Sequence, residues 1–317
     1  MGEARSGSDP RRPRFDGAVG RDGYAWWYVD AVSDDGTQGL TIIAFIGSVF
    51  SPYYGWSLDK NPFDHCAMNV VLYGRPSRFA MTERKQGSLA RSADHIAIGP
   101  SSMEWDGSEL TVRIDERGAP LPRRIKGTVR LRPSGITAGP FHLDPAGRHR
   151  WWPMAPASRV EVSLSEPGLS WQGSGYFDTN DGDEPLAAAF TRWTWCRAEL
   201  PSGAAILYDV THRGGGGRNL SLGFAFDGTR RDIRPPVPAR LPPTGFWRMP
   251  RETRSDDGRA RVITTFEDTP FYSRSLLAST LAGEPVRAVH ESLSLDRFRN
   301  PLVQLMLPFR IPRPLGG

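Results

Sequence analysis

Lysine is scarce in this chain of 317 residues: only Lys60, Lys85 and Lys126 are present, so the formal net charge of +5 rests on arginine. No run of basic residues alternates with stacking aromatic side chains, and we therefore expect no nucleic-acid partner. A basic surface favours instead an anionic partner such as a membrane leaflet.

Cysteine is equally scarce. Cys66 and Cys196 lie far apart and form no CxxC pair. This spacing argues against a zinc site and against a disulfide scaffold. We predict two buried thiols in a protein of the reducing cytosol.

Long apolar segments are missing as well. The longest apolar run, residues 40–50, is too short to span a bilayer. Residues 1–22 are rich in charge and contain no apolar stretch, so we predict a disordered arm there and no signal peptide. A soluble or peripheral protein is expected.

Common catalytic motifs are not found. The sequence has no GxSxG elbow, no GxGxxG after a strand and no HExxH, which argues against a standard hydrolase, dinucleotide enzyme or zinc protease. The acidic run 178–189 lacks the glycine and glutamate positions of an EF-hand calcium loop. Glycines 214–217 lack the Lys-Ser/Thr of a phosphate loop. We expect neither a metal nor a cofactor.

What the chain does have is 34 glycines, 28 prolines and many short alternating segments. Tyrosine- and tryptophan-rich residues 23–32, the Asp-Gly turn at 106–107 and the alternation over 125–132 are typical of antiparallel strands. No long segment has helical periodicity. We predict an all-β protein of two consecutive antiparallel barrel or barrel-like domains, residues 23–217 and 218–317. The proline-rich residues 235–243 are interpreted as an extended linker or a crossover, and residues 298–309 as a short amphipathic tail.

The candidate site lies in the acidic segment WQGSGYFDTNDGDEPL, residues 171–186, and in RHRWWPM, residues 148–154. Tyr176 and Asp178 share one face of an extended chain, and so do His149 and Trp151. If both pairs face a barrel interior, the four side chains converge. A carboxylic acid in an apolar pocket stays protonated near neutrality and can protonate an alkene. Indole and phenol rings then stabilise the carbocation, while a histidine or tyrosine positions water.

Each of these residues also has a plain structural interpretation. An aspartate in a Gly/Asn/Asp-rich segment, such as Asp178, is typical of a turn. A histidine between two arginines, such as His149, is typical of a solvated basic patch. Trp151 and Trp152 are typical of a core. Asp64 and His65 resemble an acid–base pair in a segment that the pattern does not place, and aromatic residues 53–56 either line a pocket or pack.

The sequence resembles the acyclic carotenoid 1,2-hydratases (hydroxyneurosporene synthases) of phototrophic bacteria. The resemblance is carried by GSGYFDTNDGDEPL, FTRWTWCRAELPSGAAILYDV, GYAWWYVDAVSDDGTQGLTIIAFIGSVFSPYY and PARLPPTGFWRMPR, and it extends over nearly all of the chain after about residue 20. It implies a lipocalin-like fold and addition of water across the terminal C1–C2 double bond of neurosporene or lycopene, without a redox cofactor.

The resemblance also implies roles for residues. His149, Trp151, Tyr176 and Asp178 fall on the family's His-x-Trp and Tyr-x-Asp pairs, with Asp178 as the proton donor. We add Trp152, Tyr54 and Trp193 as candidate substrate-binding residues.

Two other functions stay open: a non-catalytic carrier of a polyene, and a cyclase or pericyclase on the same scaffold. A carrier needs the aromatic lining but no buried acid, and a cyclase needs no water. Carotenoids are insoluble in water, so we expect a peripheral enzyme on the cytoplasmic face of the inner membrane, with Phe309 and Arg310 at the mouth of the pocket. The oligomeric state, the preferred carotenoid and the division of roles between His149 and Tyr176 are left open.

Overall fold

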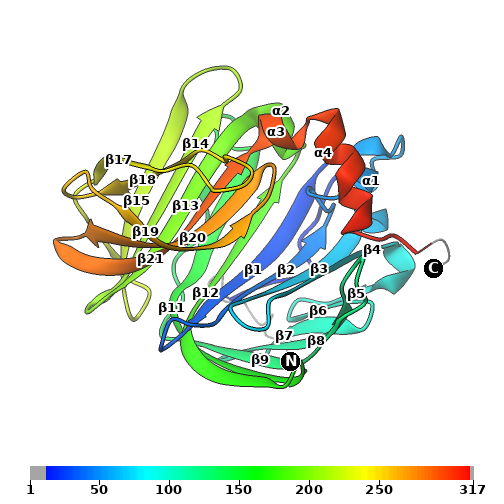
Figure 1. The fold of residues 1–317 in the computed structure, drawn as a ribbon. Helices are drawn as coiled ribbons and strands as arrows, with labels where there is room; N and C mark the ends of the chain where they lie inside the picture. Colours follow the sequence, from blue (N-terminus) through cyan, green and yellow to red (C-terminus); the bar gives the residue numbers. More distant parts are fainter. Residues whose placement is uncertain (1–11, 315–317) are drawn as a thin grey trace, which may run out of the picture.

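Antiparallel strands make up most of the protein in the computed structural model, which describes residues 12–314 (Figure 1). The helices are single turns or little more: α1 (Pro52–Trp56), α2 (Leu186–Ala189), α3 (Leu295–Phe298) and α4 (Pro301–Met306). The prediction of an all-β protein is confirmed.

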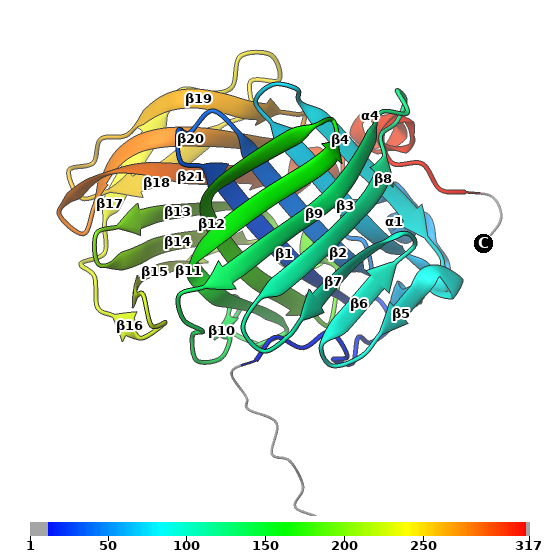
Figure 2. The ribbon, with the colours of Figure 1, turned by 90° about the horizontal axis from the view of Figure 1, so that it is seen from below.

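The first and larger sheet contains twelve strands, in the order β4-β3-β2-β1-β12-β11-β9-β8-β7-β6-β5, with β10 paired to β11 (Figure 2). Its strands are β1 (Tyr24–Ser33), β2 (Gly39–Ile46), β3 (Cys66–Tyr73), β4 (Arg78–Arg84), β5 (Leu89–Arg91), β6 (His95–Ile98), β7 (Ser101–Trp105), β8 (Leu110–Arg117), β9 (Arg124–Pro133), β10 (Phe141–His142), β11 (His149–Glu166) and β12 (Leu169–Gly182). The sheet curls until β4 lies against β8 and β9. A bond of 2.7 Å from Arg84 Nη2 to the buried Glu116 Oε2 joins β4 to β8. The result is a nearly closed barrel.

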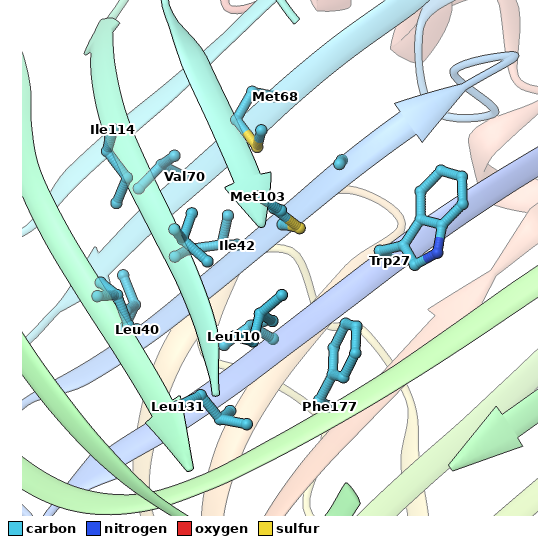
Figure 3. Close-up of a cluster of buried hydrophobic side chains, with 14 of the residues drawn as sticks. Trp27, Leu40, Ile42, Met68, Val70, Met103, Leu110, Ile114, Leu131 and Phe177 are labelled. Atoms are coloured by element: carbon cyan, nitrogen blue, oxygen red, sulfur yellow. The ribbon is translucent and has the colours of Figure 1, made fainter. Parts of the chain in front are cut away.

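The interior of this barrel is filled by side chains. Figure 3 shows residues from opposite sides of the barrel meeting there, among them Leu40, Ile42, Met68, Leu110 and Phe177. All five are fully buried. Small barrels are closed in this way by their own side chains, so this barrel has no room for a substrate inside it.

Successive side chains of β1 belong to clusters on opposite faces of the sheet. Trp27 and Val29 point into the filled barrel, while Trp26 and Tyr28 belong to a second cluster on the outer face. Successive side chains of a strand point to opposite faces. A strand that is buried on both faces must therefore pack against something outside the barrel.

That partner is the second sheet, of seven strands in the order β16-β15-β14-β13-β21-β20-β19. Its strands are β13 (Phe190–Leu200), β14 (Gly203–His212), β15 (Gly217–Ala225), β16 (Arg230–Arg231), β19 (Arg261–Asp268), β20 (Tyr272–Leu281) and β21 (Glu284–Ser294). Of the 25 buried side chains in the cluster between the two sheets, 12 are aromatic. The buried Arg197 of β13 also pairs with the buried Asp30 of β1.

The change of sheet falls between β12 and β13. Strands β13 and β14, which the predicted division at residues 217 and 218 assigns to the first domain, pair within the second sheet. The two sheets share one aromatic cluster. The division into two domains stays a prediction.

The proline-rich segment is more ordered than the sequence indicated. Within residues 235–243, β17 (Val237–Leu241) pairs with β18 (Arg251–Ser255) as a separate two-stranded sheet. In the chain, β17 and β18 lie between β16 and β19, which are at opposite edges of the second sheet, so the interpretation of this segment as a crossover is confirmed. Proline is tolerated here because β17 has a partner on one side only, and an edge strand does not need every backbone N–H for pairing.

The C-terminal segment closes one end of the space between the sheets. Helix α4 and the 3-10 turn Leu307–Phe309 lie beside the first sheet, near β4 (Figure 1). They are held by Arg313, whose Nη1 donates to the buried Glu83 Oε1 at 2.8 Å. Among residues 12–314, no helix has both the length and the apolar character needed to cross a bilayer. Both cysteines are buried and free, as predicted.

Candidate active site

A cavity of about 450 Å³ lies between the outer face of the first sheet and the second sheet. Small-molecule sites have volumes of roughly 300–1,000 Å³ and are mostly apolar with a few placed polar groups. The lining of this cavity has that character. Its aromatic residues include Trp26, Tyr28, Trp193, Trp195 and Tyr208.

Asp178 is the acid of this cavity. It lies on β12 opposite Tyr28 of β1, is buried and lines the cavity. Its Oδ2 accepts two hydrogen bonds, from Tyr176 Oη at 2.7 Å and from Trp151 Nε1 at 2.9 Å. Its Oδ1 has no hydrogen-bond partner among residues 12–314. Both donors therefore occupy one oxygen and leave the other free.

Burial raises the pKa of Asp178 to about 7, although the hydrogen bonds from Trp151 and Tyr176 act in the opposite direction. Desolvation disfavours the charged form of a buried carboxyl group. Because Oδ2 already accepts from two donors, a proton on this group sits on Oδ1. The geometry thus presents a neutral acid to an apolar cavity near neutral pH.

The two donors lie behind the acid and do not line the cavity. The ring of Trp151 packs on Tyr208 with a centroid distance of 4.8 Å, and the ring of Tyr176 packs on Trp195 at 5.0 Å. Tyr208 and Trp195 do line the cavity. Three of the four predicted side chains, Asp178, Tyr176 and Trp151, therefore meet directly, on the outer face of the barrel and not in its interior.

His149 stands apart from this group. It is fully buried on β11, with Tyr24 Oη 2.9 Å from Nδ1 and Glu184 Oε1 3.3 Å from Nε2. Burial lowers its pKa, so the neutral ring is favoured. Both contacts are satisfied when Nε2 donates to Glu184 and Nδ1 accepts from Tyr24. His149 does not line the cavity; it fixes the start of β11 two residues before Trp151.

The candidate substrate-binding residues fall in three different places. Trp193 lines the cavity. Trp152 packs against the filled barrel, where its Nε1 donates to Thr137 Oγ1 at 2.9 Å. Tyr54 lies in α1, donates to the Gly23 carbonyl at 2.7 Å and packs on His65. Trp152 and Tyr54 thus lie outside the cavity lining.

The other acids noted in the sequence serve structural contacts. Asp183 accepts two hydrogen bonds from Arg150 at the surface. Asp64 accepts from Asn61 Nδ2 at 3.1 Å, while His65 lies 2.7 Å from the buried Glu83. None of these three, Asp64, His65 or Asp183, lines the cavity.

Several cavity residues were missed from the sequence. Trp26 and Tyr28 are two residues apart on β1, as Trp193 and Trp195 are on β13, so each pair shares one face of its strand, and this spacing is a local signal in the sequence. Two further carboxylic acids, Glu267 and Glu291, also line the cavity. Nothing in their surrounding sequence distinguishes them from surface acids.

The family model and the curated relatives that match this chain agree with one another. The model of the family described as carotenoid hydratase CrtC matches residues 42–316. The acyclic carotenoid 1,2-hydratase of Thiocapsa roseopersicina is 54% identical over 317 residues, covering 98% of this chain and 78% of that protein. The acyclic carotenoid 1,2-hydratase of Rubrivivax gelatinosus is 48% identical over 309 residues, covering 95% and 76%.

Solved structures share the fold at low identity. Kievitone hydratase from Nectria haematococca has a TM-score of 0.57 and 10% identity, covering 91% of this chain and 98% of that one. A structure assigned to AttH from Nitrosomonas europaea has a TM-score of 0.60 and 14% identity, covering 89% and 99%. At such identities the likeness concerns the fold alone.

Proposed function

This chain belongs to the carotenoid hydratase CrtC family and is a hydro-lyase, and on that premise we propose that it adds water across the terminal C1–C2 double bond of an acyclic carotenoid of the neurosporene or lycopene type. The observation that carries the proposal is the geometry of Asp178, which lines an apolar cavity with one oxygen held by two donors and the other without a hydrogen-bond partner among residues 12–314. An unactivated alkene carries no charge with which the protein could form an ion pair or a charge-assisted hydrogen bond. Its hydration needs a strong, well-placed proton donor, which a buried neutral carboxyl group provides.

Asp178 gives the proton on Oδ1 to C2, and the positive charge develops at C1, where the cation is tertiary. As the proton leaves, Asp178 becomes a carboxylate, and the donors Trp151 and Tyr176 stabilise the new charge through Oδ2. Hydrogen bonds to a charged group contribute about 1.5–3 kcal/mol each. The two donors thus favour the proton transfer itself, and no cofactor takes part.

Aromatic faces around the cavity stabilise the cation. The sequence-based hypothesis assigned this role to Trp151 and Tyr176, but their polar atoms are directed at Asp178. Tyr208 and Trp195, which cover them on the cavity side, are better placed for it. A cation over such a ring gains about 0.5–2 kcal/mol.

The cavity is smaller than a whole forty-carbon substrate, so we propose that one end of the carotenoid enters while the rest extends outward. Met306, Phe309 and Arg310 line the cavity and are exposed as well, and they form its mouth. Beside them Leu302 and Leu305 of α4 are 72% and 62% exposed. Exposed apolar side chains next to an arginine are suited to the surface of an anionic membrane. We propose that this end of the molecule rests on the cytoplasmic face of the inner membrane and takes substrate from it.

A polyene carrier and a cyclase fit the same apolar cavity. Neither needs a neutral acid held by two donors, so the arrangement around Asp178 favours the hydratase. Purified protein supplied with lycopene in detergent should yield a product heavier by one water molecule. Asp178→Asn should still bind lycopene but yield no product. A parent protein that binds lycopene without changing its mass would support the carrier, and an isomer of unchanged mass the cyclase.

A further inference from the structure

A second carboxyl group faces Asp178 from the opposite wall of the cavity. Glu291 lies on β21 of the second sheet and lines the same cavity. Two aromatic residues connect the acids. Tyr28, the strand partner of Asp178, donates its hydroxyl to Glu291 Oε1 at 2.7 Å. Trp195, the strand partner of Glu291, packs against Tyr28 with a centroid distance of 5.7 Å.

The surroundings of Glu291 differ from those of Asp178. The buried guanidinium of Arg274 pairs with Glu291 Oε1 and also donates to Tyr28 Oη at 2.9 Å. A charge-assisted hydrogen bond of this kind stabilises an ionised carboxylate. No hydrogen bond from residues 12–314 reaches Glu291 Oε2. The first sheet thus contributes a carboxyl group held by two neutral donors, and the second sheet contributes one held by an arginine and a tyrosine.

Glu267 is the other carboxyl group of the lining, and it is less suited to act as a base. Burial raises its pKa, which favours the neutral form. Its Oε2 accepts from Tyr73 Oη at 3.1 Å, and the charge of Arg310 at the mouth acts on its pKa in the opposite direction to burial. Glu267 therefore belongs to the entrance side, whereas Glu291 shares its aromatic neighbours with Asp178.

We propose that Glu291 is the general base of the reaction, which takes a proton from water as the water attacks C1. This assignment rests on the hydration proposed above. The Oδ1–H bond of Asp178 breaks and a C2–H bond forms with the alkene electrons. The water oxygen then forms the C1–O bond, and one of its O–H bonds breaks as the proton passes to Glu291 Oε2. Return of that proton through water to the Asp178 carboxylate restores both groups, and the net change is the addition of one water.

The reaction does not require a strong base at this step. Water bonded to a tertiary carbocation is strongly acidic, so its proton needs only a nearby acceptor. Trp195 supplies the complementary donor, since this residue lines the cavity and its buried Nε1 has no hydrogen-bond partner among residues 12–314. Buried polar atoms of this kind are commonly satisfied by water. A water between Trp195 Nε1 and Glu291 Oε2 is held beside the base.

The test uses the full chain with lycopene and the variant Glu291→Gln, whose amide oxygen can still accept from Tyr28 and Arg274. Hydration should fall by about 10²–10⁴-fold, the usual contribution of general acid–base catalysis, while lycopene binding is kept. Azide is the diagnostic probe, because it attacks a cation without having a proton to remove. Glu291→Gln with azide should form a carotenoid azide, whereas Asp178→Asn with azide should form none. Glu199→Gln, at an exposed position of β13, is the control for loss of a carboxylate.

The outcomes separate the two proposals. A parent protein that does not hydrate lycopene contradicts the proposed function. If the parent hydrates it and Glu291→Gln does so at a similar rate, Glu291 is not the base. The same conclusion holds if folded Glu291→Gln binds lycopene but forms neither alcohol nor azide. If Glu291→Gln does not fold, Glu291→Asp is tested in its place. This variant keeps a carboxyl group beside Arg274 but shortens the side chain by one methylene. It should then lower kcat at least tenfold with KM unchanged, and a parental kcat would overturn the assignment.

Discussion

Replacing Asp178 by asparagine should stabilise the protein above neutral pH while abolishing its activity. The asparagine side chain has the same shape, and its carbonyl oxygen can take the place of Oδ2 and accept from Trp151 and Tyr176. Its amide then replaces the Oδ1 that has no partner among residues 12–314. The substitution removes only the ability to ionise.

The direction in which stability changes with pH follows from proton binding. Burial raises the pKa of Asp178 from 3.8 to about 7, so between these pH values the native state holds a proton that the unfolded state has lost. The free energy of unfolding of the parent therefore falls as the pH rises through this window, and below the window the effect is absent. At 1.36 kcal/mol per pH unit, the advantage of Asp178→Asn over the parent should grow by about 3 kcal/mol between pH 5 and pH 8.

Urea unfolding of both proteins, followed by tryptophan fluorescence at pH 5 and pH 8, measures this increase in the stability difference. All other titrating groups are common to both proteins and cancel in the difference. With an m-value of about 3 kcal/mol per M, the midpoint of Asp178→Asn should move by about 1 M relative to the parent between the two pH values. An equal difference in stability at both pH values would refute a buried neutral Asp178.

Three further predictions concern the acid and the membrane. The kcat of the parent should fall about tenfold per pH unit above about 7, as the neutral form of Asp178 is lost; a rate that is flat up to pH 9 would contradict this. Tyr176→Phe removes a hydrogen bond that lowers the pKa of Asp178, so the midpoint of this pH–rate profile should move upward, and a downward shift would show that Tyr176 acts differently. The parent should float with anionic liposomes at low salt, and the double variant Leu305→Ser, Phe309→Ser should float less; equal flotation would place the membrane contact elsewhere.

The sequence predicted best where alternation and turn residues agree. The segment predicted over residues 23–32 is β1, and the Asp-Gly turn at 106–107 joins β7 to β8. These signals are local, because aromatic and β-branched residues favour strands wherever one face is buried. Such signals do not reveal which strands pair across long distances, as β1 does with β12.

Strand β12 shows why the acidic segment was ambiguous. Its glycines, asparagine and aspartates are typical of turns, yet it is the central strand between β1 and β11. A Cβ on Gly173 would lie 2.0 Å from the carbonyl oxygen of Val32, so close packing of the neighbouring backbone requires glycine there. Contacts between residues distant in the sequence, and not local conformational preference, determine that this segment forms a strand.

Of the four side chains expected to converge, Asp178, Tyr176 and Trp151 meet in the structure, and His149 lies apart with Glu184. Neighbouring residues of a strand face opposite sides, so Trp151 and Trp152 do not line one pocket together. The cavity also lies between two sheets, where the first contributes Asp178 and the second Glu291. A single sequence does not show how two sheets pack, so the residues of the second wall other than Trp193 were not predicted.

The protonation state of Asp178 is the centre of this account, and carbon-13 NMR of aspartate-labelled protein measures it directly. The Asp178 carboxyl signal is assigned by its loss in Asp178→Asn. We expect this signal to titrate with a midpoint near pH 7 in the protein without substrate. A midpoint near the ordinary aspartate value of about 3.9 would mean that the group is charged at neutral pH, and Asp178 would not be the proton donor.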